Sequence, residues 1–286
     1  MYSFLLFEVY DRLQHKVLPI HEEYKLRIME CMTSLAKCMS SELMFTLYTK
    51  ENSPKLCQML YIAIEIAKTE QLRSLRIAAI ECIMAIARVL EDKDFEDLEV
   101  RNQVAEMFLF FLPGIASGLK RIALEDEKVG HKIPVIALKG WGRIVTLLMQ
   151  DYNVSDEKFN FIQLKQTKQT INKGSVPNSE MKRKFKDDED IKSYLQTTKR
   201  TSQWYKDTDK RLQPLVIEFV KLAHHSHPKV RSEMAIMCGL IVQNCFTPGN
   251  IIAIYRVANA GCLIHLSMTY YAQFSESFGR NTHYAL

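Results

Sequence analysis

One amphipathic stretch decides the fold class: Leu75-Arg76-Ile77-Ala78-Ala79-Ile80-Glu81-Cys82-Ile83-Met84-Ala85-Ile86. Side chains of the kind that proteins bury recur in it at steps i, i+4, i+7, i+8 and i+11, which places them on one stripe of an α-helix. These side chains are Leu75, Ala79, Cys82, Ile83 and Ile86. The stretch therefore predicts a helix that packs through a single face.

The same stripe occurs three more times along the chain. It fits the sets Tyr24, Ile28, Cys31, Met32, Leu35; Ile133, Ala137, Gly140, Trp141, Ile144; and Val230, Met234, Met237, Cys238, Ile241. Three of the four copies carry a cation directly after the first position, and these cations are Lys25, Arg76 and Arg231. An apolar residue followed by a cation is typical of the second helix of HEAT-type repeats, where we expect the cation to reach a carboxylate of a neighbouring unit.

Each stripe has a candidate partner helix before it, over residues 4–18, 55–68, 104–119 and 212–223. Pro54 is a helix-initiating signal, Pro113 should kink or restart the third partner helix, and Pro214 is expected in the first turn of the fourth. The first two repeats are slightly longer than the about 40–47 residues of a HEAT unit, and the last is separated by an insertion.

The resulting organisation is an all-α solenoid of stacked antiparallel helix pairs. Residues 1–151 hold HEAT-type repeats, residues 152–200 form a polar insertion that we expect to be disordered or weakly ordered, and residues 201–247 hold a further repeat. The low counts of glycine (10) and proline (8) also favour long helices over a β-rich fold. An irregular helical bundle with accidental similarity between its helices is the alternative.

Charge and cysteine usage narrow the class of protein. The formal net charge of +5 is mild, and the basic run Lys182-Arg183-Lys184 is followed closely by acidic residues, so we predict no nucleic-acid binding. The seven cysteines include no Cys-x-x-Cys pair, and four lie in apolar helical stretches where a reduced thiol acts as a small hydrophobe: Cys31, Cys57, Cys82 and Cys238. This pattern indicates a reducing compartment, cytoplasmic or also nuclear.

The sequence predicts no membrane association. The first ten residues are apolar but carry Glu8 and have no basic leader, which is unlike a signal peptide. The apolar stretch 251–274 contains Arg256, Asn259 and His265, which argues against a membrane span.

No motif points to catalysis, a cofactor or a metal. His224, His225 and His227 cluster in a turn before Pro228, but near-consecutive histidines point in divergent directions, so a solvated turn is the better interpretation. The segments 140–142 and 112–114 lack phosphate-loop spacing, and Trp141 lies on a packing stripe. The acidic run 125–127 should face water. We therefore predict that the protein is not an enzyme and that it binds other proteins through its stacked helices, with no partner-binding residue identified.

Several motifs resemble one known family, the Tel-two-interacting protein one family. They are Phe111-Leu112-Pro113-Gly114-Ile115, Leu119 and Arg121, Gly130-His131, Trp204 with Lys210 and Leu212, and His227-Pro228-Lys229-Val230-Arg231. The similarity covers roughly residues 5–244. An acidic residue usually precedes the tryptophan in the family, whereas Gln203 stands there in this chain. From Pro248 onward the sequence departs from the family, so residues 248–286 are predicted to be a divergent C-terminal tail.

The resemblance implies a non-catalytic HEAT-repeat scaffold of the Triple T (TTT) co-chaperone complex. As partners it implies the other TTT subunits, the Hsp-ninety machinery and the phosphatidylinositol-3-kinase-related kinases of the mTOR and ATM classes. Family members are much longer than this chain, which corresponds to their N-terminal portion. The alternative is another HEAT-repeat adaptor, such as a nuclear-transport receptor or a phosphatase scaffold.

Overall fold

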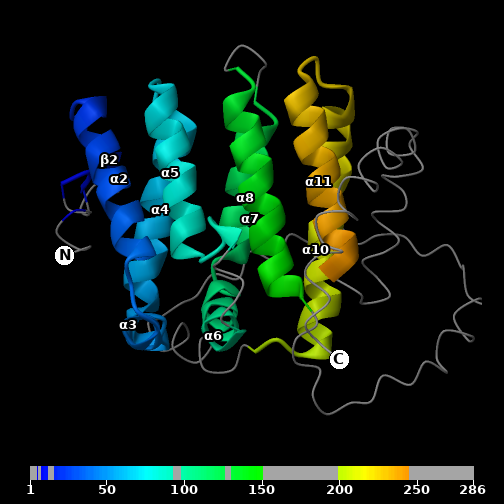
Figure 1. The fold of residues 1–286 in the computed structure, drawn as a ribbon, viewed down its shortest axis with the longest axis horizontal. Helices are drawn as coiled ribbons and strands as arrows, with labels where there is room; N and C mark the ends of the chain where they lie inside the picture. Colours follow the sequence, from blue (N-terminus) through cyan, green and yellow to red (C-terminus); the bar gives the residue numbers. More distant parts are fainter. Residues whose placement is uncertain are drawn as a thin grey trace, which may run out of the picture. The chain divides into compact units, whose positions relative to one another are not determined.

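The computed structural model describes residues 5, 8–11, 16–92, 98–125, 130–150 and 199–244, and all of its helices belong to one compact unit. Figure 1 shows two layers of helices in this unit, with α2, α5, α8 and α11 side by side in one layer. The helices are α2 (Glu22–Lys37), α3 (Ser41–Leu47), η1 (Lys50–Asn52), α4 (Ser53–Thr69), α5 (Arg73–Ile86), α6 (Leu98–Phe108), α7 (Leu112–Ala123), α8 (Lys132–Met149), α10 (Ser202–Phe219), η5 (Val220–His224) and α11 (Pro228–Asn244).

The helices form antiparallel pairs that stack on one another. α4 pairs with α5 and α7 pairs with α8, while the chain passes from α10 through η5 into α11. Between pairs, α5 packs on α2 and α8, α8 packs on α11, and α4 packs on α7. The described helices therefore confirm the predicted all-α solenoid of stacked helix pairs.

Three of the four predicted stripes are buried as predicted. The stripe of α5, that of α8 and that of α11 are all in the core. The stripe predicted in α2 is wrong by one helical position, because Tyr24 and Cys31 are exposed and the buried face is Lys25, Ile28, Met29, Met32 and Ala36. Among the described helices α2 packs chiefly on α5, so a narrower face is buried and the periodic pattern leaves its register less defined.

The partner helices differ more from the sequence prediction. α4 matches the predicted helix 55–68 and begins with Pro54 in its first turn. Pro113 restarts the chain as predicted, so that residues 104–119 are divided between α6 and α7. The prediction for 212–223 is wrong at its start, since α10 begins at Ser202, where the Thr201 hydroxyl accepts from the Trp204 amide. Pro214 thus lies inside α10, on its exposed side, where water can satisfy the carbonyl that loses its donor.

The helix predicted over residues 4–18 is wrong at residues 10–11 and 16–17, although Leu5 is helical. Tyr10–Asp11 (β1) and Lys16–Val17 (β2) form an antiparallel pair with Tyr10 opposite Val17. Val9 and Tyr10 are buried, and the Tyr10 ring meets the edge of Tyr61 on α4. A short apolar run cannot be assigned to helix or strand by periodicity alone, and the β-branched and aromatic residues here favour the strand.

The insertion predicted at 152–200 and the tail predicted at 248–286 lie outside the described residues, apart from Lys199 and Arg200. The basic run 182–184 and the apolar stretch 251–274 lie outside them as well. Arg200 belongs to the described part of the chain, where its guanidinium donates to Glu106 Oε1 on α6 at 2.7 Å. This residue, which the sequence places in the polar insertion, therefore contacts the packed helices.

The core between the pairs is closed by small and aromatic residues. A Cβ added to Gly142 of α8 would lie 2.7 Å from Met237 Cγ of α11, so the two helices can approach this closely only with glycine there. Trp141 is 1% exposed, donates from Nε1 to the Ala116 carbonyl at 3.2 Å and meets Phe219 edge to face. Trp141 is thus a core residue, as the stripe predicts.

Candidate interaction surface

α2, α5, α8 and α11 begin at the same edge of the helix layer, at the top in Figure 1. Two of the predicted cations do join neighbouring units there. Lys25 Nζ lies 2.6 Å from Glu70 Oε1 at the end of α4, and the Arg76 guanidinium bonds both Glu125, after α7, and the Ala67 carbonyl. The prediction that these cations reach carboxylates of the next unit is confirmed for both.

For Arg231 the described residues show a different contact. Its guanidinium donates to the carbonyl oxygens of His225 at 2.7 Å and Ser226 at 2.9 Å, both in the turn that precedes its own helix. Described residues end at Asn244 in α11, so no later unit of the described structure could offer a carboxylate. Arg231 instead braces the turn before α11 through backbone carbonyls.

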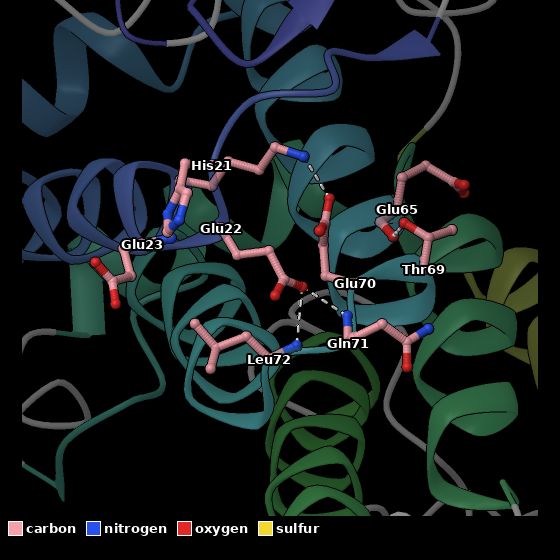
Figure 2. A network of polar contacts seen from close by, with 9 residues as sticks. His21, Glu22, Glu23, Glu65, Thr69, Glu70, Gln71 and Leu72 are labelled. Carbon is pink, nitrogen blue, oxygen red and sulfur yellow. Dashed lines mark hydrogen bonds and ion pairs between the residues drawn. The ribbon is translucent and has the colours of Figure 1, made fainter.

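Glu22 makes a second link between units that the stripe pattern does not predict. Figure 2 shows its carboxylate at the start of α5, where Oε1 accepts from the Gln71 amide at 2.7 Å and the Leu72 amide at 2.9 Å. Leu72, the N-cap residue of α5, has no side-chain cap of its own, so α2 supplies the cap. These bonds, first that from Leu72, hold the pKa of Glu22 below its usual value.

Arginines join the opposite ends of the same helices. Arg88 donates to the Ala36 carbonyl near the end of α2 at 3.3 Å. Arg143 of α8 donates to the Val89 and Leu90 carbonyls after α5, at 2.9 and 3.1 Å. Sequence reasoning missed these arginines because a guanidinium that bonds backbone carbonyls needs no partner of a recognisable residue type. Polar bonds between successive units are therefore present at both the N-terminal and the C-terminal ends of the helices in this layer.

The histidine cluster adopts a definite arrangement. The His227 ring stacks on His131, with ring centroids 3.6 Å apart and planes within 6°. His225 Nδ1 accepts from the His227 amide, and His227 Nδ1 accepts from the Lys229 amide. The prediction of a turn is correct, but His227 is in contact with another unit. Both residues occur in the quoted motifs Gly130-His131 and His227-Pro228, and that was the only sequence signal for this contact.

The described residues contain no cluster of three or more His, Cys, Asp or Glu side chains able to hold a metal ion. The two glycine segments lie within or at the start of packed helices, with Leu112-Pro113-Gly114 beginning α7. Glu125 is paired with Arg76 rather than fully solvated, while Asp126 and Glu127 lie outside the described residues. Trp141, Gly142 and Glu125 therefore take part in contacts between helices.

The four cysteines that the sequence places in apolar helical stretches differ in burial. Cys82 and Cys238 are buried, and burial raises the pKa of each thiol to about 12. Cys31 and Cys57 are exposed, because each faces away from the stripe that packs on the neighbouring helix. Large apolar side chains are also exposed on the helices, namely Tyr24, Leu43, Tyr61 and Ile217.

The described helices form a stack of helix pairs, and successive pairs are joined by polar bonds at both ends of their helices. Polar and apolar side chains are exposed on the outside of the stack. Residues 1–247 match the family model described as the TTI1 N-terminal TPR domain. The chain belongs to the TTI1 family. A TPR unit has about 34 residues and a HEAT unit about 40–47, and the first units of this chain are longer than either, but both terms describe stacked antiparallel helix pairs.

Two curated mammalian proteins are similar to this chain in sequence. The human TELO2-interacting protein 1 homolog is 24% identical over 242 residues, which are 83% of this chain and 20% of the relative. The mouse protein of the same name is 23% identical over the same length and share. The chain thus spans about a fifth of the length of the relatives it matches. No solved structure matches it. Among the described helices, none is both long and apolar enough to cross a bilayer.

Proposed function

We propose that this chain is a non-catalytic helical-repeat scaffold of the TTT co-chaperone complex. In this role it supports the maturation and stability of the phosphatidylinositol-3-kinase-related kinases of the mTOR and ATM classes. Its direct partners are the other TTT subunits, with the Hsp-ninety machinery and the kinases as further components. Its place of action is the cytoplasm and also the nucleus.

The observation that carries the proposal is the family match over residues 1–247. The name of the human and mouse relatives states an interaction with TELO2, and we extend that interaction to this chain. The described helices agree with such a role, because stacked pairs present a long continuous surface without requiring any chemistry from the chain. A scaffold acts by the area that it offers to partners, so the integrity of the stack matters more than any single residue.

Affinity purification tests the proposal directly. The full chain carrying an affinity tag is expressed in cells and recovered under mild conditions, and co-purifying proteins are quantified by mass spectrometry. We expect the TELO2 counterpart, the third TTT subunit and at least one of the large kinases. Recovery of none of these above the level of the tag alone overturns the proposal, and recovery of a transport receptor's cargo or a phosphatase subunit instead favours another adaptor role.

Two variants show whether the stack carries the binding. Trp141→Ala removes a side chain that is buried against the Ala116 carbonyl and Phe219, so it should loosen the stack and reduce partner recovery. Cys31→Ser changes an exposed position by one atom and should leave recovery unchanged. Equal recovery with both variants means that the packed helices do not carry the interaction.

A further inference from the structure

Cationic side chains gather where α5, α8 and α11 begin. Arg73, Lys132 and Lys229 lie in the first turns of these helices, and all three are exposed. His131 and His227 stack on each other between the turns that lead into α8 and α11. We call these five residues the cationic edge.

The three turns of the cationic edge are neighbours in space. The backbone of Gly130 is in a left-handed conformation (φ +88°), and the Arg73 guanidinium lies 3.5 Å from where a Cβ of residue 130 would be. The next residue, His131, stacks on His227, which in turn bonds the Lys229 amide. Contacts thus run without a break from the start of α5 to the start of α11.

This charge distribution opposes what helix stability favours. The N-terminal end of a helix carries partial positive charge, so carboxylates in the first turn stabilise it and cations destabilise it. α2 follows the preference with Glu22 and Glu23, whereas the first turns of α5, α8 and α11 contain no acidic residue. The start of α5 already receives the Glu22 carboxylate from α2, whereas no acidic residue stands in the first turn of α8 or α11. At these two helices, helix stability gives no reason for the cations, and a bound anion would.

The charges around His131 have one sign among the described residues. The pKa of His131 is lowered by partial burial and then by His227, Lys229, Lys132 and His225, and no carboxylate is among these groups. The described carboxylates of the adjoining elements have partners of their own, and Glu22 accepts from the Gln71 and Leu72 amides at the start of α5. Glu125 bonds Arg76, and Glu233 of α11 lies near Lys139 and Arg143 of α8.

We propose that the cationic edge docks an acidic segment of a protein partner. Carboxylates of such a segment would accept from Lys132 and Lys229, and the His131–His227 pair would gain a counter-charge for its protonated form. A nucleic acid fits less well, because the aromatic rings of the edge, His131 and His227, are already stacked on each other and not on a base. The inference rests on the proposed scaffold role for the kind of partner but not for the site itself.

Direct binding to the purified full-length chain tests the proposal. The probe is a fluorescein-labelled peptide of alternating Glu and Ser, followed by fluorescence anisotropy at low salt. We expect binding that weakens with added salt and is lost when Gln replaces Glu in the peptide. A single-stranded oligonucleotide and phosphatidylserine vesicles are the competing probes, and tighter binding of either one overturns the proposal.

Two charge-matched variants locate the binding. Lys132→Glu with Lys229→Glu should weaken peptide binding about tenfold or more, because two attractions become repulsions. Lys206→Glu with Lys210→Glu makes the same change in net charge at exposed positions of α10 and should bind like the wild type. Equal loss in both variants, or no loss in the first, overturns the proposal, and circular dichroism verifies that each variant is folded.

The histidine pair adds a second measurement, the pH dependence of peptide binding. A purely structural role of the pair would not produce this dependence. Lowering the pH from about 7.5 to about 5.5 should strengthen peptide binding, because His131, whose pKa is lowered, then takes up a proton next to the ligand's carboxylates. His131→Gln with His227→Gln should bind with little dependence on pH over this range. A wild type whose binding weakens or stays constant as the pH falls overturns the role of the pair.

The purification experiment separates this inference from the proposed function. Recovery of TTT subunits that is unchanged in the Lys132→Glu, Lys229→Glu variant, together with unchanged peptide binding, overturns the docking edge and leaves the scaffold role intact. Peptide binding that depends on the edge, in a chain that recovers no TTT subunit, does the reverse. Loss of both peptide binding and one TTT subunit in the edge variant supports both.

Discussion

At the scale of single residues, the cysteines show how position within a helix decides chemistry. Cys82 and Cys238 lie on stripes that pack between helices, whereas Cys31 lies one register position away from the buried face of α2. A buried thiol loses the hydration that its thiolate needs, and the pKa of both buried thiols is raised to about 12.

Alkylation of the folded chain should therefore be selective. With iodoacetamide at pH 8, Cys31 and Cys38 should react within minutes, while Cys82 and Cys238 should react only when the chain is unfolded in denaturant. Peptide mass spectrometry after quenching identifies the modified positions. Modification of Cys82 as fast as Cys31 in the native chain would contradict the packing of α5.

His131 should make the stability of the chain depend on pH. Its folded-state pKa is lowered, so the unfolded chain binds the proton more tightly, and the free energy of unfolding falls as the pH drops below about 6.5. We expect the thermal midpoint to decrease between pH 7.5 and 5.5, and His131→Gln to decrease less. An equal decrease in both proteins would mean that other groups cause the loss.

At the scale of elements, glycines separate helix propensity from helix packing. Gly142→Ala improves intrinsic propensity, but its Cβ would lie 2.7 Å from Met237 Cγ and 3.5 Å from the Met237 backbone. In α11, a Cβ at Gly239 would meet nothing within 4 Å. The two positions differ in their surroundings rather than in their local conformation.

Substitution by alanine should consequently have opposite effects at these two glycines. Gly239→Ala should raise the free energy of unfolding by about 0.5–1 kcal/mol, since Ala is the better helix former. Gly142→Ala should lower it by about 1–3 kcal/mol, since α8 and α11 must move apart. Urea denaturation measures both, and stabilisation by Gly142→Ala would show that the helices pack less closely than described.

The bond between Lys25 and Glu70 allows a matched test of the links between units. The side chains of Lys25 and Glu70 are 5% and 13% exposed, whereas those of the pair Arg27 and Glu30 are 76% and 47% exposed. Glu70→Gln should lower the free energy of unfolding by about 2–4 kcal/mol, because it leaves a buried ammonium without its counter-charge. Glu30→Gln should change it by less than about 0.5 kcal/mol, and equal effects would contradict the predicted dependence on burial.

At the scale of the whole molecule, stability should follow the order of the stack. α5 packs on α2, α4 and α8, and α8 packs on α5, α7 and α11, whereas α2 packs chiefly on α5 among the described elements. In a stack of repeats each unit is stabilised by its neighbours, so interior units open less often than outer ones.

Native-state hydrogen exchange should reveal this order. The backbone amides of α5 and α8 should exchange slowest, and those of α2 and α3 should exchange through local openings of lower free energy. Exchange followed by mass spectrometry of peptic fragments gives the comparison within one sample. Uniform protection of all described helices would instead indicate that the stack unfolds as a single cooperative unit.

The stripes of α5, α8 and α11 could be predicted from the sequence because the spacing of their apolar residues matches one face of a helix. The start of α10 could not, since Pro214 is an equally good signal for a first turn and for an exposed interior position. The stacking of His131 on His227 could not be predicted from the sequence either, because it joins two turns that are far apart in the chain. Local pattern predicts the face that a helix buries, but it does not predict which distant turn lies beside its own.

The sequence by itself determined that this protein is helical, that its helices repeat, and that it belongs with the TTI1 family, because periodicity and motifs are properties of neighbouring residues. Only the tertiary structure decided which groups meet between units: Glu22 with the start of α5, Lys25 with Glu70, and His131 with His227. Those contacts depend on how successive helix pairs are rotated and spaced when their apolar faces pack. That geometry is set by the shapes of all the side chains between the helices at once, and no local pattern specifies it.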